Sequence, residues 1–131
     1  MNDAVHVFAG QFPSRSAACE YTEAQWEPEP SEDASDEDYA AWEQRNPVWP
    51  LRRDLDVYLD SDFIETIDGD ERDSYLEGLL EDGSAISEIR RLAPEGGNVY
   101  VLVFREALGD FSGDLKSTPK LTYCGEFPCR T

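Results

Sequence analysis

The chain has 131 residues, of which 40% are hydrophobic and 31% are charged, and its formal net charge at pH 7 is −18. This length can bury a core without disulfides or metal ions, and the hydrophobic content excludes a chain that stays disordered, so we expect a single domain over residues 1–131. Direct binding to nucleic acid or to an anionic membrane is disfavoured, because both would be repelled.

The negative charge is concentrated in the middle of the chain. Between Glu20 and Asp82 there are 22 acidic and four basic residues, a net charge of −18, whereas the remainder nets zero. A one-sided field of this kind attracts basic surfaces and speeds their encounter. We therefore expect a basic protein partner. The alternative is that the acidic residues only keep the chain soluble.

The first elements are a strand and a helix. Residues 4–9 are rich in β-branched and aromatic side chains and predict a strand that ends at Gly10. Ser14 is a suitable N-cap for a helix that continues to about Ala24. The first nine residues lack the basic leader and long apolar run of a signal peptide, which favours a cytoplasmic location.

An acidic segment follows. Residues 26–37 contain the run EPEPSEDASDE, whose prolines, serines and like charges predict an exposed loop. Ser35 and Asp38 resemble a capping box for a short helix that ends at Asn46-Pro47. Trp26, Trp42 and Trp49 flank this segment, and we interpret them mainly as packing anchors that could also contact a partner.

The second half of the chain predicts strands, then two helices, then two more strands. Residues 57–59 and 63–67 have strand composition and are separated by an Asp-Ser-Asp turn. Apolar side chains at helical spacing predict one helix that ends at Gly83 and a second that ends at Gly96-Gly97. Residues 98–104 are nearly all apolar and predict the central strand, followed by a turn at 111–113 and a last strand at 120–124.

These elements predict an α+β fold. We expect one mixed or antiparallel sheet of about four to five strands, centred on residues 98–104, with helices packed against it.

Asp60 and Asp62 are the most enzyme-like pair in the sequence. Two aspartates after a short apolar strand resemble the start of phosphotransfer enzymes of the haloacid dehalogenase type, in which the first is the nucleophile and the second the acid or base. Ile64 departs from that motif, which has Thr or Val there. A charged turn is the stronger interpretation, because aspartate is a favoured turn residue.

We expect neither a metal site nor a cofactor. Asp68, Asp70 and Asp73 are suited to a hard cation, but their spacing is not that of an EF-hand. Cys124 and Cys129 with the single histidine, His6, are too few ligands for zinc. An odd count of three cysteines favours reduced thiols, although the last two could pair under oxidation.

Several short motifs resemble the immunity protein 22 family of bacterial polymorphic toxin systems. They are the opening strand Val7-Phe8-Ala9-Gly10-Gln11-Phe12, the following helix with Tyr21, the later Asp62-Phe63-Ile64-Glu65, and the strand at 98–102. The resemblance implies a protein that binds and neutralises a cognate toxin without turnover. The segment from Trp26 to Pro50 departs from the family, so a partner surface there cannot be carried over.

The charge and the resemblance together predict the contact residues. A toxin that binds phosphate has a basic cleft, which an acidic inhibitor can occupy. The predicted contacts are Asp60, Asp62, Glu65, Asp68, Asp70 and Glu71, with Trp42 and Trp49 as possible anchors. The alternatives are a DNA-mimic regulator of a nucleic-acid-binding protein and a small Asp-dependent phosphohydrolase.

Overall fold

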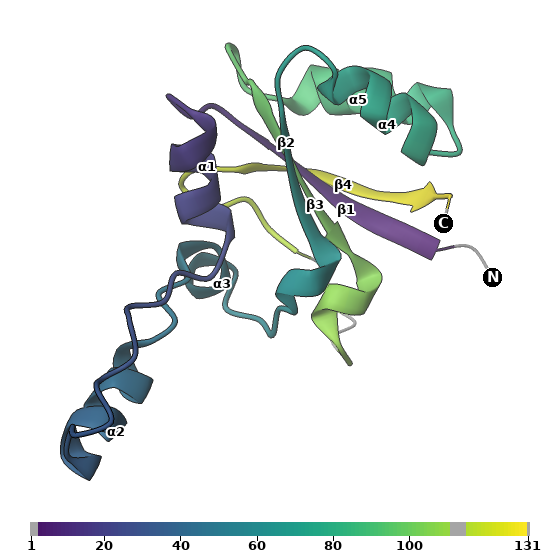
Figure 1. Cartoon of the computed structure of the whole chain (residues 1–131). Coiled ribbons are helices and arrows are strands. Elements are labelled where there is room, and N and C mark those ends of the chain that lie inside the picture. The colour runs from purple at the N-terminus through teal and green to yellow at the C-terminus, as the bar shows by residue number, and fades with distance from the viewer. Residues whose placement is uncertain (1–2, 111–114, 131) are drawn as a thin grey trace.

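The core of the molecule is a four-stranded antiparallel sheet (Figure 1). The computed structural model describes residues 3–110 and 115–130. The strands are β1 (Asp3–Gly10), β2 (Ile64–Asp68), β3 (Val99–Phe104) and β4 (Thr122–Cys129), in the order β2-β3-β1-β4. The predicted α+β fold is confirmed, and of the two sheet types expected the antiparallel one is present.

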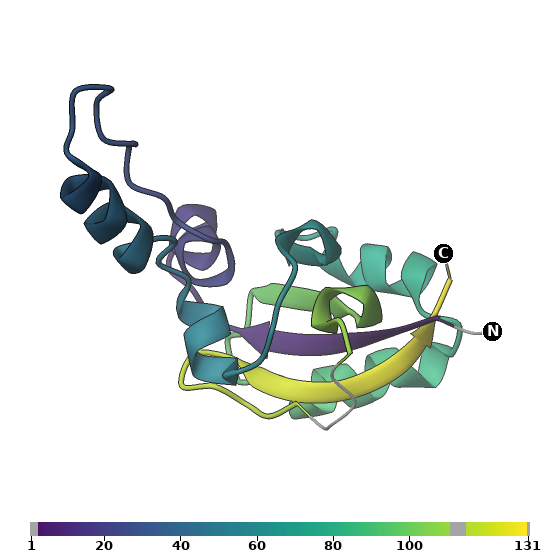
Figure 2. The same ribbon diagram turned by 90° about the horizontal axis from the view of Figure 1, so that it is seen from below.

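Helices cover both faces of this sheet. The described residues form α1 (Arg15–Thr22), α2 (Asp36–Arg45), α3 (Pro50–Leu55), α4 (Arg72–Leu79) and α5 (Gly83–Leu92), with 3₁₀ turns η1 (Ser61–Phe63) and η2 (Arg105–Leu108). In Figure 1 and Figure 2, α4 and α5 lie together at one side of the sheet, and α2 stands away from it. No helix in this part of the chain has the length and apolarity needed to cross a membrane.

The sheet separates two apolar clusters. Alternate residues of a strand point to opposite faces, so Val99, Val101 and Val103 pack toward α1 and α3. Tyr100 and Leu102 pack toward α4 and α5. The expectation that residues 98–104 form a strand buried on both faces is therefore confirmed over Val99–Phe104.

Several elements differ from the sequence prediction. The helix α3 was not predicted, and α5 ends at Leu92 and not at Gly96-Gly97. Residues 57–59 are not a strand: they follow the left-handed turn at Asp56, the Asp60 amide after them bonds to the Ala107 carbonyl of η2, and only Leu59 of the three is buried. Gly83 begins α5 instead of ending α4, because the Asp82 side chain accepts the Ser84 amide and caps a new helix. The last strand runs over Thr122–Cys129 and not over 120–124, whereas the turn predicted at 111–113 lies outside the described residues.

Candidate functional site: the acidic arm and the edge strand

Residues 25–48 leave the body of the molecule and return to it at one point, and we call them the acidic arm (Figure 2). The Gln25 amide donates to the Val48 carbonyl at 2.9 Å, and the Val48 amide donates to the Gln25 carbonyl at 2.8 Å. This reciprocal pair closes the arm at its base. The arm is therefore a defined projection, in which residues 26–35 form no helix or strand and α2 follows where the sequence predicts a short helix after Ser35.

Trp42 holds the arm together from inside. Its ring is 7% exposed and lies 5.8 Å from the ring of Trp26 and 5.6 Å from that of Tyr39, measured between centroids. Its Nε1 donates to the Glu27 carbonyl at 3.1 Å. Three aromatic rings and one hydrogen bond thus give the arm a small core of its own, separate from the two clusters on the sheet.

A second set of contacts joins the two sides of the arm. The Glu27 amide donates to Asn46 Oδ1 at 2.9 Å, and Asn46 Nδ2 donates back to Glu27 Oε2 at 2.9 Å. Arg45 Nε lies 2.6 Å from the same carboxylate oxygen. These bonds from Asn46 and Arg45 favour the charged carboxylate and lower the pKa of Glu27.

The other carboxylates of the arm point to solvent. They have no ion pair or side-chain hydrogen bond within the described residues, and they are Glu29, Glu32, Asp33, Asp36, Glu37, Asp38 and Glu43. Ser35 caps α2 by accepting the Asp38 amide, and acidic residues in the first turn suit the positive end of the helix dipole. Trp26 and Tyr39 are 60% and 39% exposed on the same arm. Unpaired carboxylates beside exposed aromatic rings are what a basic protein surface can bind.

The six carboxylates predicted as contacts follow β2 from end to end. Asp60 and Asp62 lie at η1, just before the strand, and Asp70 and Glu71 lie just after it. Asp60 Oδ1 accepts the Asp62 amide at 3.0 Å, which gives Asp60 the capping role expected of a turn residue. The side chains of Asp62, Asp70 and Glu71 have no hydrogen bond or ion pair within the described residues.

Within the strand, Glu65 and Asp68 lie on opposite faces of the sheet. Glu65 accepts a short hydrogen bond from the Tyr75 hydroxyl on α4, and that bond, followed by burial, raises the pKa of Tyr75 to about 12. Asp68 lies 2.6 Å from Arg15 Nη1 on α1. The structure therefore brings the six carboxylates to one edge of the sheet without gathering them into one patch.

Trp42 and Trp49 are both buried, and they act as the packing anchors that the sequence favours. Trp49 is 9% exposed, and its Nε1 donates to the Thr22 carbonyl at 2.8 Å. On the arm the exposed rings are Trp26 and Tyr39. The sequence analysis groups Trp26 with the packing anchors, and neither ring is among the predicted contact residues. Their only signal was a position beside the acidic run, which does not distinguish an exposed ring from a buried one.

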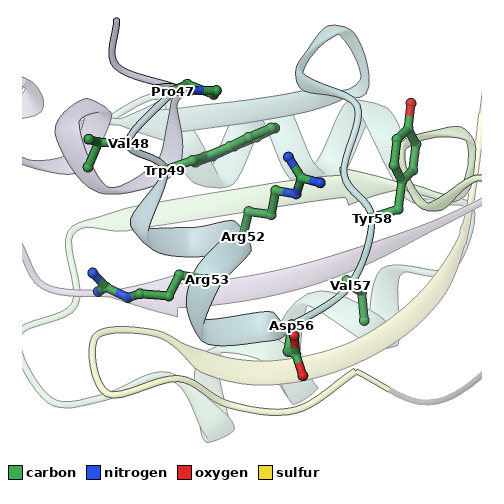
Figure 3. A pocket seen from close by; sticks show the side chains of 8 residues that line it. All are labelled: Pro47, Val48, Trp49, Arg52, Arg53, Asp56, Val57 and Tyr58. Atoms are coloured by element: carbon green, nitrogen blue, oxygen red, sulfur yellow. The ribbon is translucent and has the colours of Figure 1, made fainter. Parts of the chain in front are cut away.

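A groove of about 590 Å³ lies beside the base of the arm, between α3 and residues 56–58 (Figure 3). Arg52 extends between Trp49 and Tyr58, whereas Arg53 points away and pairs with Asp54 at 3.2 Å. Arg52, Arg53 and Asp56 line this groove, so its lining carries more positive than negative charge. A basic surface is therefore attracted more strongly to the arm and β2 than to the groove.

The remaining candidates for chemistry are engaged in structural contacts. Asp73 lies 3.0 Å from Arg90 and accepts the Tyr100 hydroxyl at 2.9 Å. His6 is buried, with Nδ1 at 2.8 Å from the Tyr123 hydroxyl and Nε2 at 3.2 Å from Glu126. Over residues 3–110 and 115–130, no three metal-ligating side chains come together.

The arm and β2 meet at a small hollow. A space of about 320 Å³ is lined by Thr22, Trp26, Ser61 and Ile64, among others, and so connects the base of the arm to the start of β2. Glu23 also lines this space, so it contains one carboxylate and one exposed ring, that of Trp26. Comparison with protein-family models, with curated proteins and with solved structures finds no match for this chain.

Proposed function

We propose that this chain is a cytoplasmic immunity-type protein, which binds a basic toxin domain through the acidic arm and neutralises it without turnover or cofactor. The observation that carries the proposal is the arm itself: a closed projection with seven solvent-facing carboxylates and two exposed rings. An ordered arm loses less conformational entropy on binding than a disordered acidic tail would, so more of the contact energy is available for affinity.

Electrostatic steering and local packing have separate roles in this proposal. The carboxylates of the arm and of β2 attract the partner and raise the association rate, an effect that salt weakens. Trp26 and Tyr39 bury apolar area once contact is made, and they slow dissociation. The resemblance to the immunity protein 22 family supports a toxin as the target. Nuclease toxins hold a basic cleft for phosphate, and such a cleft is opposite in charge to the arm.

The test compares two variants with the same loss of charge. The arm variant carries Glu29→Gln, Glu32→Gln, Asp33→Asn and Glu37→Gln, and the control carries the same number of substitutions at exposed positions outside the arm: Glu77→Gln, Glu81→Gln, Glu95→Gln and Glu106→Gln. Tagged wild-type protein captures its partner from a lysate of its own source at low salt. The association rate of the purified partner is then measured for all three proteins.

We expect the arm variant to associate about tenfold more slowly than wild type at low salt, and the control variant to lose much less. Expression of the partner alone should arrest growth, and co-expression of the wild-type chain should restore it. Equal association rates for the two variants would overturn the role of the arm. Recovery of a housekeeping nucleic-acid-binding protein that DNA releases would instead identify a DNA mimic.

A further inference from the structure

The two edge strands of the sheet, β4 and β2, differ in whether their outer peptide groups are hydrogen-bonded. The outer side of β4 is occupied: the Glu81 amide donates to the Pro128 carbonyl at 3.3 Å, and the Arg130 amide donates to the Leu79 carbonyl at 2.8 Å. The Tyr123 amide donates to Ser117 Oγ at 2.8 Å. The β1–β4 register also shifts between Val7 and Phe8. Covered peptide groups and an irregular register are the usual protections of an edge strand.

The outer side of β2 has no such protection. From Glu65 to Asp68, no backbone N–H or C=O bonds to a described residue outside β3. The strand is regular, with five paired positions, and its sequence IETID contains no proline or lysine. An edge of this kind presents a row of unpaired peptide groups that another strand can use.

Charge decides which strand can use this edge. Two copies of this chain paired through β2 would bring the carboxylates around Glu65 and Asp68 together, and like charges across strands are destabilising. A basic strand meets Glu65 and the unpaired carboxylates at the two ends of β2 favourably, whereas Asp68 is already paired with Arg15. Phe63 and Tyr75 are 41% and 42% exposed beside β2, so they can also pack against apolar side chains of an added strand.

We propose that β2 is a docking edge, which a basic strand of the partner extends as an additional antiparallel or parallel strand of the sheet. This inference rests on the proposed function for the identity of the partner as a basic protein. Main-chain hydrogen bonds supply affinity in this mode, and the side chains on either side supply specificity. The hollow between Trp26 and Ile64 lies at the start of the same edge and receives the first side chain of the added strand.

The probe is a short peptide of alternating lysine and valine, added to the ¹⁵N-labelled full chain at low salt. A peptide that repeats Lys-Pro-Pro with the same number of lysines has the same charge but cannot continue a ladder, because its prolines fall on both edges of an extended strand and lack the amide N–H. Hydrogen exchange is followed at each backbone amide. At a peptide concentration ten times its dissociation constant, the outward-pointing amides of residues 65–68 should exchange about tenfold more slowly with the valine peptide only.

Three results would overturn the proposal. They are equal protection by both peptides, protection confined to residues 25–48, and protection in the absence of peptide that grows with protein concentration and so indicates a second copy. Glu65→Gln keeps an acceptor for Tyr75 and should weaken binding of the valine peptide, whereas Glu77→Gln, an equal change of charge on α4, should not.

The same experiment on the arm variant distinguishes this proposal from the proposed function. Protection at 65–68 that survives neutralisation of the arm supports a docking edge whatever the arm binds. The arm variant can instead lose association with the partner while neither wild type nor the arm variant shows protection at 65–68. That result would support the arm alone and overturn the docking edge.

Discussion

The Tyr21 hydroxyl donates to Asp54 Oδ2 at 2.6 Å and thereby joins α1 to α3. The same hydroxyl lies 2.7 Å from Thr118 Oγ1, so three segments converge on it. Burial, and then the bond to Asp54, raises the pKa of Tyr21 to about 12. The bond from Tyr21 also lowers the pKa of Asp54. Because α1 and α3 carry the two ends of the arm, this pair fixes the base from which the arm projects.

Tyr21→Phe should reduce the free energy of unfolding by about 1–2 kcal/mol at pH 7, as expected for a hydrogen bond to a carboxylate that is mostly buried. The raised pKa of Tyr21 means that the neutral phenol is favoured in the folded state. Its contribution is therefore complete below the ordinary value of 10.0 and is lost as the pH rises through about 12. Urea unfolding should show the stabilities of wild type and variant converging between pH 10 and pH 12. Tyr39→Phe is the control variant. A stability difference between wild type and Tyr21→Phe that does not change as the pH rises would contradict this expectation.

Trp49→Ala and Trp42→Ala should have different effects, although both rings are buried. Trp49 belongs to the cluster under α1 and α3, so its removal should cost about 3–5 kcal/mol of global stability. Trp42 packs only within the arm, so its removal should speed amide exchange over residues 25–48 and shift the global urea midpoint much less. Equal losses of global stability would show that the arm folds as part of the main core.

Cys124 should be much less reactive than Cys19. Burial raises the pKa of Cys124 to about 11, so the thiolate that attacks reagents is scarce at pH 8. Burial also raises the pKa of Cys19, but this thiol is only half-buried on α1. Mass spectrometry after iodoacetamide treatment should find Cys19 modified first, with the difference removed in urea. Rapid modification of Cys124 in native protein would indicate that α5 opens from the sheet.

Two glycines should respond in opposite directions to alanine. A Cβ on Gly10 would lie 2.8 Å from both the Lys120 carbonyl oxygen and Leu121 Cδ2, so Gly10→Ala should cost about 1–3 kcal/mol. A Cβ on Gly78 in α4 meets nothing within 4 Å, so Gly78→Ala should stabilise the protein by about 0.5–1 kcal/mol. Thermal unfolding of both variants provides the comparison, and a destabilised Gly78→Ala would show that α4 is not a regular helix there.

Capping signals predict where α1 and α2 begin, because capping is a local interaction, whereas α3 has no side-chain cap and was not predicted. Ser14 and Ser35 cap α1 and α2 as their sequences indicate, through side-chain bonds to amides three residues later. Strand composition is less informative, since Val57-Tyr58-Leu59 has it and forms no strand. A strand needs a neighbour, and whether one exists depends on the order of the whole sheet.

The same limit applies to the candidate site. The sequence identifies the carboxylates from Asp60 to Glu71, but their arrangement along an edge follows from the place of β2 in the order β2-β3-β1-β4. The closure of the arm is similarly nonlocal, because Gln25 and Val48 are joined by backbone groups that have no sequence signature.

The paired backbone at Gln25 and Val48 makes the arm an exchangeable module. The chain leaves and re-enters the sheet domain through one pair of peptide groups, so residues 26–47 can lengthen, shorten or change composition while the strands keep their register. The surface that the arm presents can therefore change at little risk to folding. Grafting a different arm between the same two residues would be a direct way to retarget this scaffold.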